Sequence, residues 1–266
     1  MTPRISVIMG IYNCGSTLAE ALDSLLAQTC QDFKVIMCDD GSSDNTLHIA
    51  LQYVSRDPDK FILIQNERNM GLNYTLNHCL KYADTEYVAR MDGDDISLPT
   101  RFEQELNFLD CHPEIAIVST PMIYFDENGD FRRGGGGDRY PDKNDFVTGT
   151  PFCHAPCMVR REAYEAVGGY SVDPKLLRVE DYHLWFKMYA KGYRGYILAE
   201  PLYRMRDDRN AIGRRTWRNR INEFHVRRIG YSMLSLPLHK RIWMLRPIIV
   251  GLLPRPIYNY LHRRNS

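Results

Sequence analysis

Residues 5–26 read ISVIMGIYNCGSTLAEALDSLL, and this stretch decides the fold. Its first seven residues form the apolar run that is typical of a buried strand. Asn13 and Gly15 follow and are typical of a loop. Leucines then recur at helical spacing from residue 18 to residue 26. The stretch therefore predicts a strand over Ile5–Ile11, a loop and a helix.

The same alternation repeats along the first 120 residues. Further strands are expected at 33–38, 61–64, 87–91 and 115–119, and helices from about 44, at 72–83 and from 99 to about 111. Such alternation implies right-handed crossovers and a parallel sheet with helices on both faces. Ligands bind such sheets beyond the carboxyl ends of the strands. We therefore expect an α/β, Rossmann-like fold with a mostly parallel central sheet and its site at that edge.

After residue 120 the pattern changes. Residues 126–145 are rich in Gly, Asp, Arg and Pro, which predicts a mobile loop. Strands are then expected at 152–159 and 196–198, and helices at 162–167, 181–190, 216–229, 238–253 (broken at Pro247) and 257–262. No internal repeat and no second folded domain is apparent.

Charge is distributed unevenly along the 266 residues. The net charge is only +1, but residues 201–266 hold 15 Lys and Arg against 3 Asp and Glu, and residues 1–200 hold 19 against 30. A basic tail on an acidic body indicates an anionic partner, such as lipid head groups, a phosphate-bearing substrate or nucleic acid. A merely solvated basic surface is the alternative.

The tail also carries an apolar stretch, residues 242–253, which contains Arg246 and Pro247. A spanning helix needs about 20 apolar residues, so this stretch is too short to cross a bilayer. Aromatic residues stand beside arginines here, as in helices that lie on anionic membranes. We expect a helical tail at the membrane surface; helices that simply pack on the rest of the chain are the alternative.

The cysteines and the N-terminus indicate a cytosolic protein. The first residues lead directly into a strand, so no secretory signal is expected. Without such a signal, the seven scattered cysteines are expected to be reduced thiols. Cys153, His154 and Cys157 cluster, but no second pair of ligands lies at zinc-site spacing. A structural zinc ion is not expected.

The strongest chemical signal is Asp92-Gly93-Asp94-Asp95 at the end of the fourth strand. Three carboxylates so close together repel one another unless a cation or hydrogen-bond donors compensate. Mg²⁺ commonly shares its shell between one or two carboxylates and substrate phosphates. The alternative is an acidic loop that caps the following helix.

Three weaker signals lie at other strand or helix ends. Asp39-Asp40 follows the second strand and can accept hydrogen bonds from a base or ribose, or cap a turn. Asn69-Met70-Gly71 precedes a helix whose backbone N–H groups can approach a diphosphate. Glu180-Asp181 opens a helix and can include a general base, although acidic residues are common in a first turn.

Together these motifs resemble those of a known family. ISVIMGIYN (5–13), CDDGSSDNT (38–46), NMGLN (69–73), ARMDGDDISLP (89–99), FCHAPCMVRREAYEAVGGY (152–170) and EDYHLW (180–185) occur in the order found in family-2 glycosyltransferases of GT-A fold. The resemblance covers about residues 4–205 and is closest to small bacterial enzymes of surface-polysaccharide or lipopolysaccharide synthesis. It implies inverting transfer from a nucleotide-diphosphate sugar, with Mg²⁺ or Mn²⁺ as the cofactor.

The resemblance also implies roles for individual residues. Tyr12 would flank the nucleobase and Asp40 would bond to it. Asp92 would lie near the ribose, and Asp94 would bind the metal that bridges the diphosphate. Asp181 would be the catalytic base that deprotonates the acceptor hydroxyl.

Three further residues complete the expected site. Asn69 belongs to the diphosphate-approaching turn, and His154 and Arg206 would serve the acceptor or diphosphate side. The chain departs from the family pattern at Gly10, where many members have a hydroxyl or proline. It also has Met205 and Arg206 where many relatives have a histidine.

By this interpretation residues 1–205 form the catalytic domain, with a nucleotide-sugar half at 1–120 and an acceptor half at 121–205, and residues 206–266 form the basic helical tail. The expected reaction moves a hexose from a donor, which we expect to be UDP-linked, to a lipid-linked saccharide in surface-polysaccharide synthesis. The expected location is the cytoplasmic face of the cell membrane.

Three other functions fit the sequence less well. A nucleotidyltransferase is expected to have a lysine in a glycine-rich phosphate loop after the first strand, and residues 10–17 contain no lysine. A catalytically dead scaffold should have lost a carboxylate from the motifs, and none is missing. A nucleic-acid binder is disfavoured by the acidic body and by the lack of a recognisable binding motif.

Overall fold

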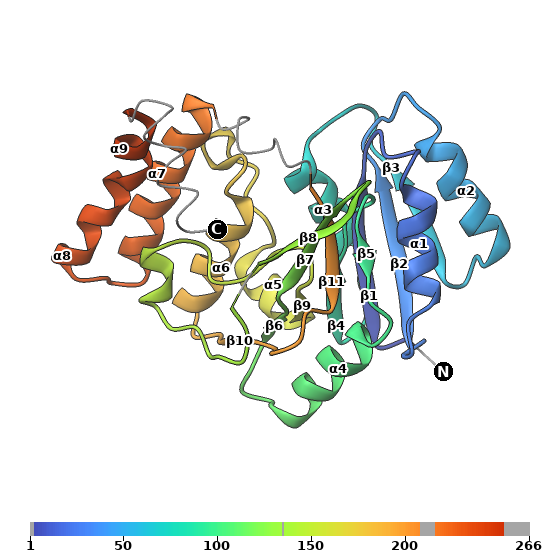
Figure 1. The fold of residues 1–266 in the computed structure, drawn as a ribbon, viewed down its shortest axis with the longest axis horizontal. Coiled ribbons are helices and arrows are strands. Elements are labelled where there is room, and N and C mark those ends of the chain that lie inside the picture. Colours follow the sequence, from blue (N-terminus) through green and yellow to red (C-terminus); the bar gives the residue numbers. More distant parts are fainter. Residues whose placement is uncertain (1–2, 135, 208–215, 253–266) are drawn as a thin grey trace.

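A seven-stranded sheet forms the centre of the computed structural model, which describes residues 3–134, 136–207 and 216–252 (Figure 1). Its order is β10-β6-β9-β4-β1-β2-β3. The strands are β1 (Ile5–Ile11), β2 (Phe33–Asp39), β3 (Phe61–Gln65), β4 (Tyr87–Arg90), β6 (Ile117–Ser119), β9 (Met158–Arg160) and β10 (Gly195–Ile197). Only β9 runs antiparallel to its neighbours, β4 and β6, so the prediction of a mostly parallel sheet is confirmed.

Helices cover both faces of this sheet. α1 (Leu18–Leu26), α2 (Thr46–Arg56) and α4 (Arg101–Cys111) pack on one face, and α3 (Leu72–Leu80), α5 (Arg161–Val167) and α6 (Glu180–Ala190) pack on the other. Successive side chains of a strand point to opposite faces, so Val7 and Met9 join one core and Ile8 joins the other. This three-layer arrangement is the α/β architecture that the alternating pattern predicts.

A second, four-stranded sheet corrects the interpretation of residues 126–145. Its order is β5-β11-β7-β8, formed by Ile96–Ser97, Tyr203–Arg206, Met122–Asp126 and Gly129–Gly134. The expected mobile loop is therefore partly a hairpin, and it is followed by a short 3₁₀ helix at Asp145–Val147. The hairpin turns at Gly129, whose φ of 104° suits glycine. β8 could not be predicted because it is a half-exposed edge strand with a single apolar residue, Phe131, and therefore no apolar alternation.

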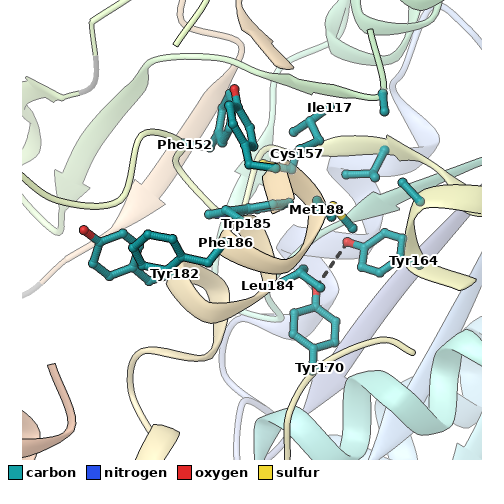
Figure 2. Packing of buried hydrophobic residues seen from close by; sticks show 14 of the residues in the cluster. Ile117, Phe152, Cys157, Tyr164, Tyr170, Tyr182, Leu184, Trp185, Phe186 and Met188 are labelled. Atoms are coloured by element: carbon teal, nitrogen blue, oxygen red, sulfur yellow. Dashed lines mark hydrogen bonds between the residues drawn. The ribbon is translucent and has the colours of Figure 1, made fainter. Parts of the chain in front are cut away.

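α6 is the most deeply buried helix of the second layer. Seven of its eleven residues are buried, including Trp185. The reason is that α6 packs between the central sheet and a later helix. Figure 2 shows Trp185 against Phe152, with ring centroids 5.5 Å apart, and the hydroxyls of Tyr164 and Tyr170 in a hydrogen bond of 3.1 Å. The strand expected at 152–159 is only β9, since residues 152–157 fill this core as a loop.

That later helix is α7 (Trp217–Met233), which packs on α6. After α7 come α8 (Leu238–Arg241), a 3₁₀ turn (Ile242–Leu245) and α9 (Arg246–Leu252). The helix expected at 238–253 is interrupted before Pro247, at the 3₁₀ turn. Pro247 itself lies in the first turn of α9, where a proline leaves no hydrogen bond unmade. The helix expected at 257–262 lies outside the described residues.

Gly230 sets how closely α7 approaches α6. A Cβ at this position would lie 2.2 Å from the ring of Phe186, which is fully buried. Gly230→Ala should therefore destabilise the protein by about 1–3 kcal/mol, despite the better helix propensity of alanine. The expected fall in Tm is about 2–10 °C, measured by differential scanning calorimetry.

Gly136→Ala is the matched control. A Cβ at Gly136 would meet nothing nearer than 3.9 Å, so the control should change stability by less than about 0.5 kcal/mol. If Gly230→Ala were as stable as the control, α7 would not be packed on α6 in solution.

Candidate active site

Three carboxylates gather directly after β4. Oxygen atoms of Asp92, Asp94 and Asp95 lie within 4.8 Å of one another. Asp95 is buried, and its Oδ1 accepts a bond of 2.8 Å from the backbone N–H of Arg206. Its Oδ2 has no hydrogen-bond partner among the described residues. Burial and the charges of Asp92 and Asp94 raise the pKa of Asp95 to about 8.

One buried guanidinium lies beneath this cluster. Arg90, the last residue of β4, is 4% exposed and forms an ion pair with Asp92. Its charge also favours the ionised form of Asp181 and disfavours protonation of His154. Arg90 and the nearby Arg206 compensate the three carboxylates only in part, because burial and mutual repulsion still raise the pKa values of Asp94 and Asp95. This donor set fits a hard divalent cation.

A cavity of about 330 Å³ opens over these carboxylates, and we call it the carboxylate cavity. Tyr12, Asp92, Asp94 and Arg206 line it together with residues of the loop after β1. The Nε of Arg206 donates a bond of 2.9 Å to the backbone carbonyl of Asp94, and its guanidinium pairs with Glu20. The side chain is thereby held at the cavity wall, so four of the predicted site residues share one cavity.

A second cavity, of about 430 Å³, adjoins the ends of β1 and β2, and we call it the strand-end cavity. Tyr12, Asp40, Asn69 and Glu180 are among the residues that line it. Tyr12 also lines the carboxylate cavity, and its side chain is half-exposed. The two cavities are therefore adjacent and share an aromatic side chain.

Asp40 organises one wall of the strand-end cavity. Its carboxylate accepts three hydrogen bonds of 2.8 Å each, from the side chain of Asn66 and the backbone N–H groups of Met70 and Gly71. These bonds fix the turn that contains Asn69. Carboxylate oxygens can accept more than one bond each, so this role leaves capacity for a ligand.

The third cavity, of about 480 Å³, is lined by four arginines, and we call it the arginine cavity. Its lining residues are Thr148, Gly149, Thr150, Arg178, Val179, Asp181, Tyr182, Asn219, Arg220, Glu223, Arg227, Arg246, Pro247 and Val250.

The Glu180-Asp181 pair lies where the strand-end and arginine cavities meet. Glu180 lines the first cavity and Asp181 the second, and Arg178 and Asn219 line both. Burial and the neighbouring charge of Glu180 raise the pKa of Asp181 to about 6. A carboxylate with such a pKa is suited to take up a proton near neutral pH.

His154 occupies a different position from the other predicted site residues. Its Nε2 lies 2.8 Å from the hydroxyl of Tyr170, and its ring packs edge-on against Trp185. It is not among the residues that line the three cavities described above. Burial lowers the pKa of this imidazole well below its usual range, so the ring is neutral.

Sequence reasoning missed several residues of the site. Asn219 and Asn222 come from α7, and the side chain of Asn222 donates a bond of 3.0 Å to the carbonyl of Leu177. Arg178 has a φ of 68°, a conformation uncommon outside glycine and a known mark of functional sites. No local motif identifies Asn219 and Asn222, because they reach the cavities only through the packing of α7 on α6, and Arg178 lies in the loop just before α6.

Comparison with known proteins assigns the chain to a family. The model of the family "Glycosyl transferase family 2" matches residues 6–168. EpsE of Bacillus subtilis (strain 168), a proposed glycosyltransferase, is 40% identical over 98% of this chain and 94% of its own length. The UDP-Gal:α-D-GlcNAc-diphosphoundecaprenol β-1,3-galactosyltransferase of Escherichia coli is 29% identical, over 99% of this chain and 96% of its own length.

The fold agrees as well. The crystal structure of residues 1–349 of S. aureus TarS in complex with UDP-GlcNAc superposes with a TM-score of 0.72 at 21% identity, covering 93% of this chain and 72% of that one. The predicted GT-A fold is thereby confirmed. With the family model matching more than half of its length, the chain belongs to glycosyltransferase family 2.

Proposed function

We propose that this glycosyltransferase moves a hexose from a UDP-sugar to a lipid-linked saccharide, with inversion at the anomeric carbon. The observation that carries the proposal is the meeting of two cavities at Glu180-Asp181, one of which shares Tyr12 with the carboxylate cavity. A transferase needs two binding sites that share one reaction centre, and this arrangement supports such a pair. The Escherichia coli relative, named for UDP-Gal and a lipid-linked GlcNAc acceptor, supports both substrate classes.

The strand-end and carboxylate cavities would hold the donor. Tyr12 lies between them and is exposed enough to stack on a nucleobase. Asp40 and Asn69 would contact the nucleoside and its phosphates. Asp92 and Asp94 would hold a Mg²⁺ or Mn²⁺ ion, which would compensate the charge of the leaving diphosphate.

Asp181 would be the catalytic base of the reaction. It would accept the proton of the acceptor hydroxyl while that oxygen forms its bond to the anomeric carbon. The bond from this carbon to the diphosphate oxygen would break on the opposite face, which inverts the configuration. The raised pKa of Asp181 supports this role, because it places the proton affinity of the carboxylate closer to working pH.

The tail would bring the enzyme to its acceptor at the membrane. Leu238 is 81% exposed, Ile242 66% and Leu252 71%, and Lys240 and Arg241 lie between the first two in the sequence. Apolar side chains next to cations are the combination that binds an anionic lipid surface. Within the described ranges, none of the helices has the length and hydropathy to span a bilayer.

The metal assignment predicts a ligand-dependent gain in stability. UDP with Mn²⁺, at about 100 times its Kd, should raise the free energy of unfolding of the wild type by about 2.7 kcal/mol. Asp94→Ala should lose most of this gain and should abolish transfer. Differential scanning fluorimetry and a transfer assay in EDTA check the two expectations.

Asp59→Ala is the control, because Asp59 is exposed and lies outside the three cavities. It should respond to UDP and Mn²⁺ as the wild type does. Full activity in EDTA, or an unchanged rate in Asp94→Ala, would contradict the metal assignment.

The base assignment predicts a specific pH profile. Since only the ionised carboxylate accepts a proton, kcat/KM should fall about tenfold per pH unit below about pH 6 and level off above it. Asp181→Asn should lower kcat by about 10² or more and remove this dependence, with nucleotide affinity nearly intact. If nucleotide affinity collapsed while kcat survived, Asp181 would be a binding or structural residue.

The membrane assignment predicts an effect of exposed leucines. Leu238→Ser/Leu252→Ser should lower partitioning onto phosphatidylglycerol vesicles at least about tenfold, because each leucine contributes about 1.5–3 kcal/mol when it is buried. Leu51→Ser on α2, at a leucine 46% exposed, is the control and should bind as the wild type does. Vesicle sedimentation measures both. Failure of the wild type to sediment at low salt would rule out this role for the tail.

A further inference from the structure

We propose that the arginine cavity binds the phosphate groups that join the acceptor saccharide to its lipid. The inference rests on the proposed function, since it takes the acceptor to be lipid-linked. It adds the residues that would recognise the charged part of that acceptor: Arg178, Arg220 and Arg246.

The charges that line the cavity favour an anion. Arg227 and Glu223 neutralise each other in an ion pair of 2.9 Å, and Arg227 also donates a bond of 2.7 Å to the carbonyl of Val147. The remaining charged lining residues are three arginines and Asp181. Arg178 and Arg246 alone outnumber Asp181, so this lining is net positive even with the proposed base ionised. Arginine is well suited to phosphate, because its planar group can donate two parallel hydrogen bonds.

Two of these arginines are already held in place. Arg246 Nη1 donates a bond of 3.1 Å to the carbonyl of Thr148, and Arg220 Nη1 donates a bond of 3.5 Å to the carbonyl of Pro247. A guanidinium has five N–H donors, so the carbonyl contact orients Arg246 and still permits contact with a phosphate. Side chains that are ordered before binding lose less entropy when a ligand arrives.

The packing of α9 on α7 maintains this arrangement. Gly251 permits the close approach, because a Cβ there would lie 2.7 Å from the Cδ of Arg220 and 3.0 Å from the ring of Trp217. α7 lies between α6 and α9 (Figure 1), so the cavity is walled by all three helices.

One cavity presents both a carboxylate for the saccharide hydroxyl and arginines for the phosphates of a lipid-linked sugar. Asp181 in the first turn of α6 would face the saccharide hydroxyl, and the arginines would face the phosphates. Pro247 and Val250 of α9 line the cavity. Ile249 lies between them in the sequence and is 58% exposed. The lipid would leave the cavity along this apolar helix.

Two acceptors that differ only in charge test the inference. One is α-GlcNAc linked through a diphosphate to an alkyl chain, and the other is the uncharged α-GlcNAc glycoside of the same chain, both in neutral detergent. Wild-type enzyme should prefer the diphosphate acceptor. In Arg246→Gln and Arg220→Gln the ratio of kcat/KM between the two acceptors should fall about tenfold, which corresponds to about 1.4 kcal/mol.

Two further variants serve as controls. Arg228→Gln changes an exposed arginine of α7 that does not line the cavity, and it should keep the wild-type ratio. Arg246→Lys retains the charge and should lose less than Arg246→Gln. An equal loss on both acceptors would show a structural role for the arginines and overturn the inference.

A binding measurement identifies the source of the phosphate. Farnesyl diphosphate, titrated by calorimetry in EDTA and neutral detergent, should bind about tenfold more weakly to Arg246→Gln than to the wild type, and saturating UDP should not displace it. Displacement by UDP would place the anion in the donor cavities. A loss in Arg246→Gln confined to binding of phosphatidylglycerol vesicles would assign the arginine to lipid head groups. Either result overturns the inference.

Failure of this inference can be distinguished from failure of the proposed function. If the wild type transferred sugar to neither acceptor with any UDP-hexose, the proposed function itself would be wrong, and the inference with it. If the wild type used both acceptors equally well, only the phosphate site would be wrong.

Discussion

The buried ion pair between Arg90 and Asp92 is the interaction on which the rest of the site depends. A guanidinium that is 4% exposed is costly to bury unless anions surround it, and here the carboxylates after β4 and Asp181 supply them. The carboxylates also depend on the guanidinium, because three adjacent negative charges repel one another unless a cation compensates them. Arg90 therefore makes it possible for the acidic motif and the Glu180-Asp181 pair, which lie almost ninety residues apart in the chain, to share one edge of the sheet.

The contribution of α7 explains why the chain needs its basic C-terminal part for a complete site. The N-terminal elements, together with Arg206 of β11, build the carboxylate cavity, and they form one side of the strand-end cavity. Asn219 and Asn222 close the strand-end cavity, and Arg220 helps to form the arginine cavity. The packing of Gly230 on Phe186 fixes α7 against α6, so a contact far from the cavities determines where these side chains lie.

Much of the fold could be predicted because its signals are local. The apolar run at Ile5–Ile11 and the leucine spacing after it encode strand and helix directly, and Asp92 and Asp94 fall at a strand end, where such folds place ligands. The hairpin of β7 and β8 could not be predicted, because its second strand is an exposed edge without apolar alternation. Arg178 could not be predicted either, since its importance comes from its position between two cavities and its left-handed backbone.

α9 has a further consequence for the products that such an enzyme can make. It is one wall of the arginine cavity, and its exposed side carries Ile249 and Leu252. An α-helix with its side chains is about 10–12 Å across. With its exposed side on lipid, α9 would act as a spacer that sets the height of the reaction centre above the membrane. Sugars close to the lipid would then lie within reach, and the far end of a long chain would not, which would assign the enzyme to an early step of chain assembly.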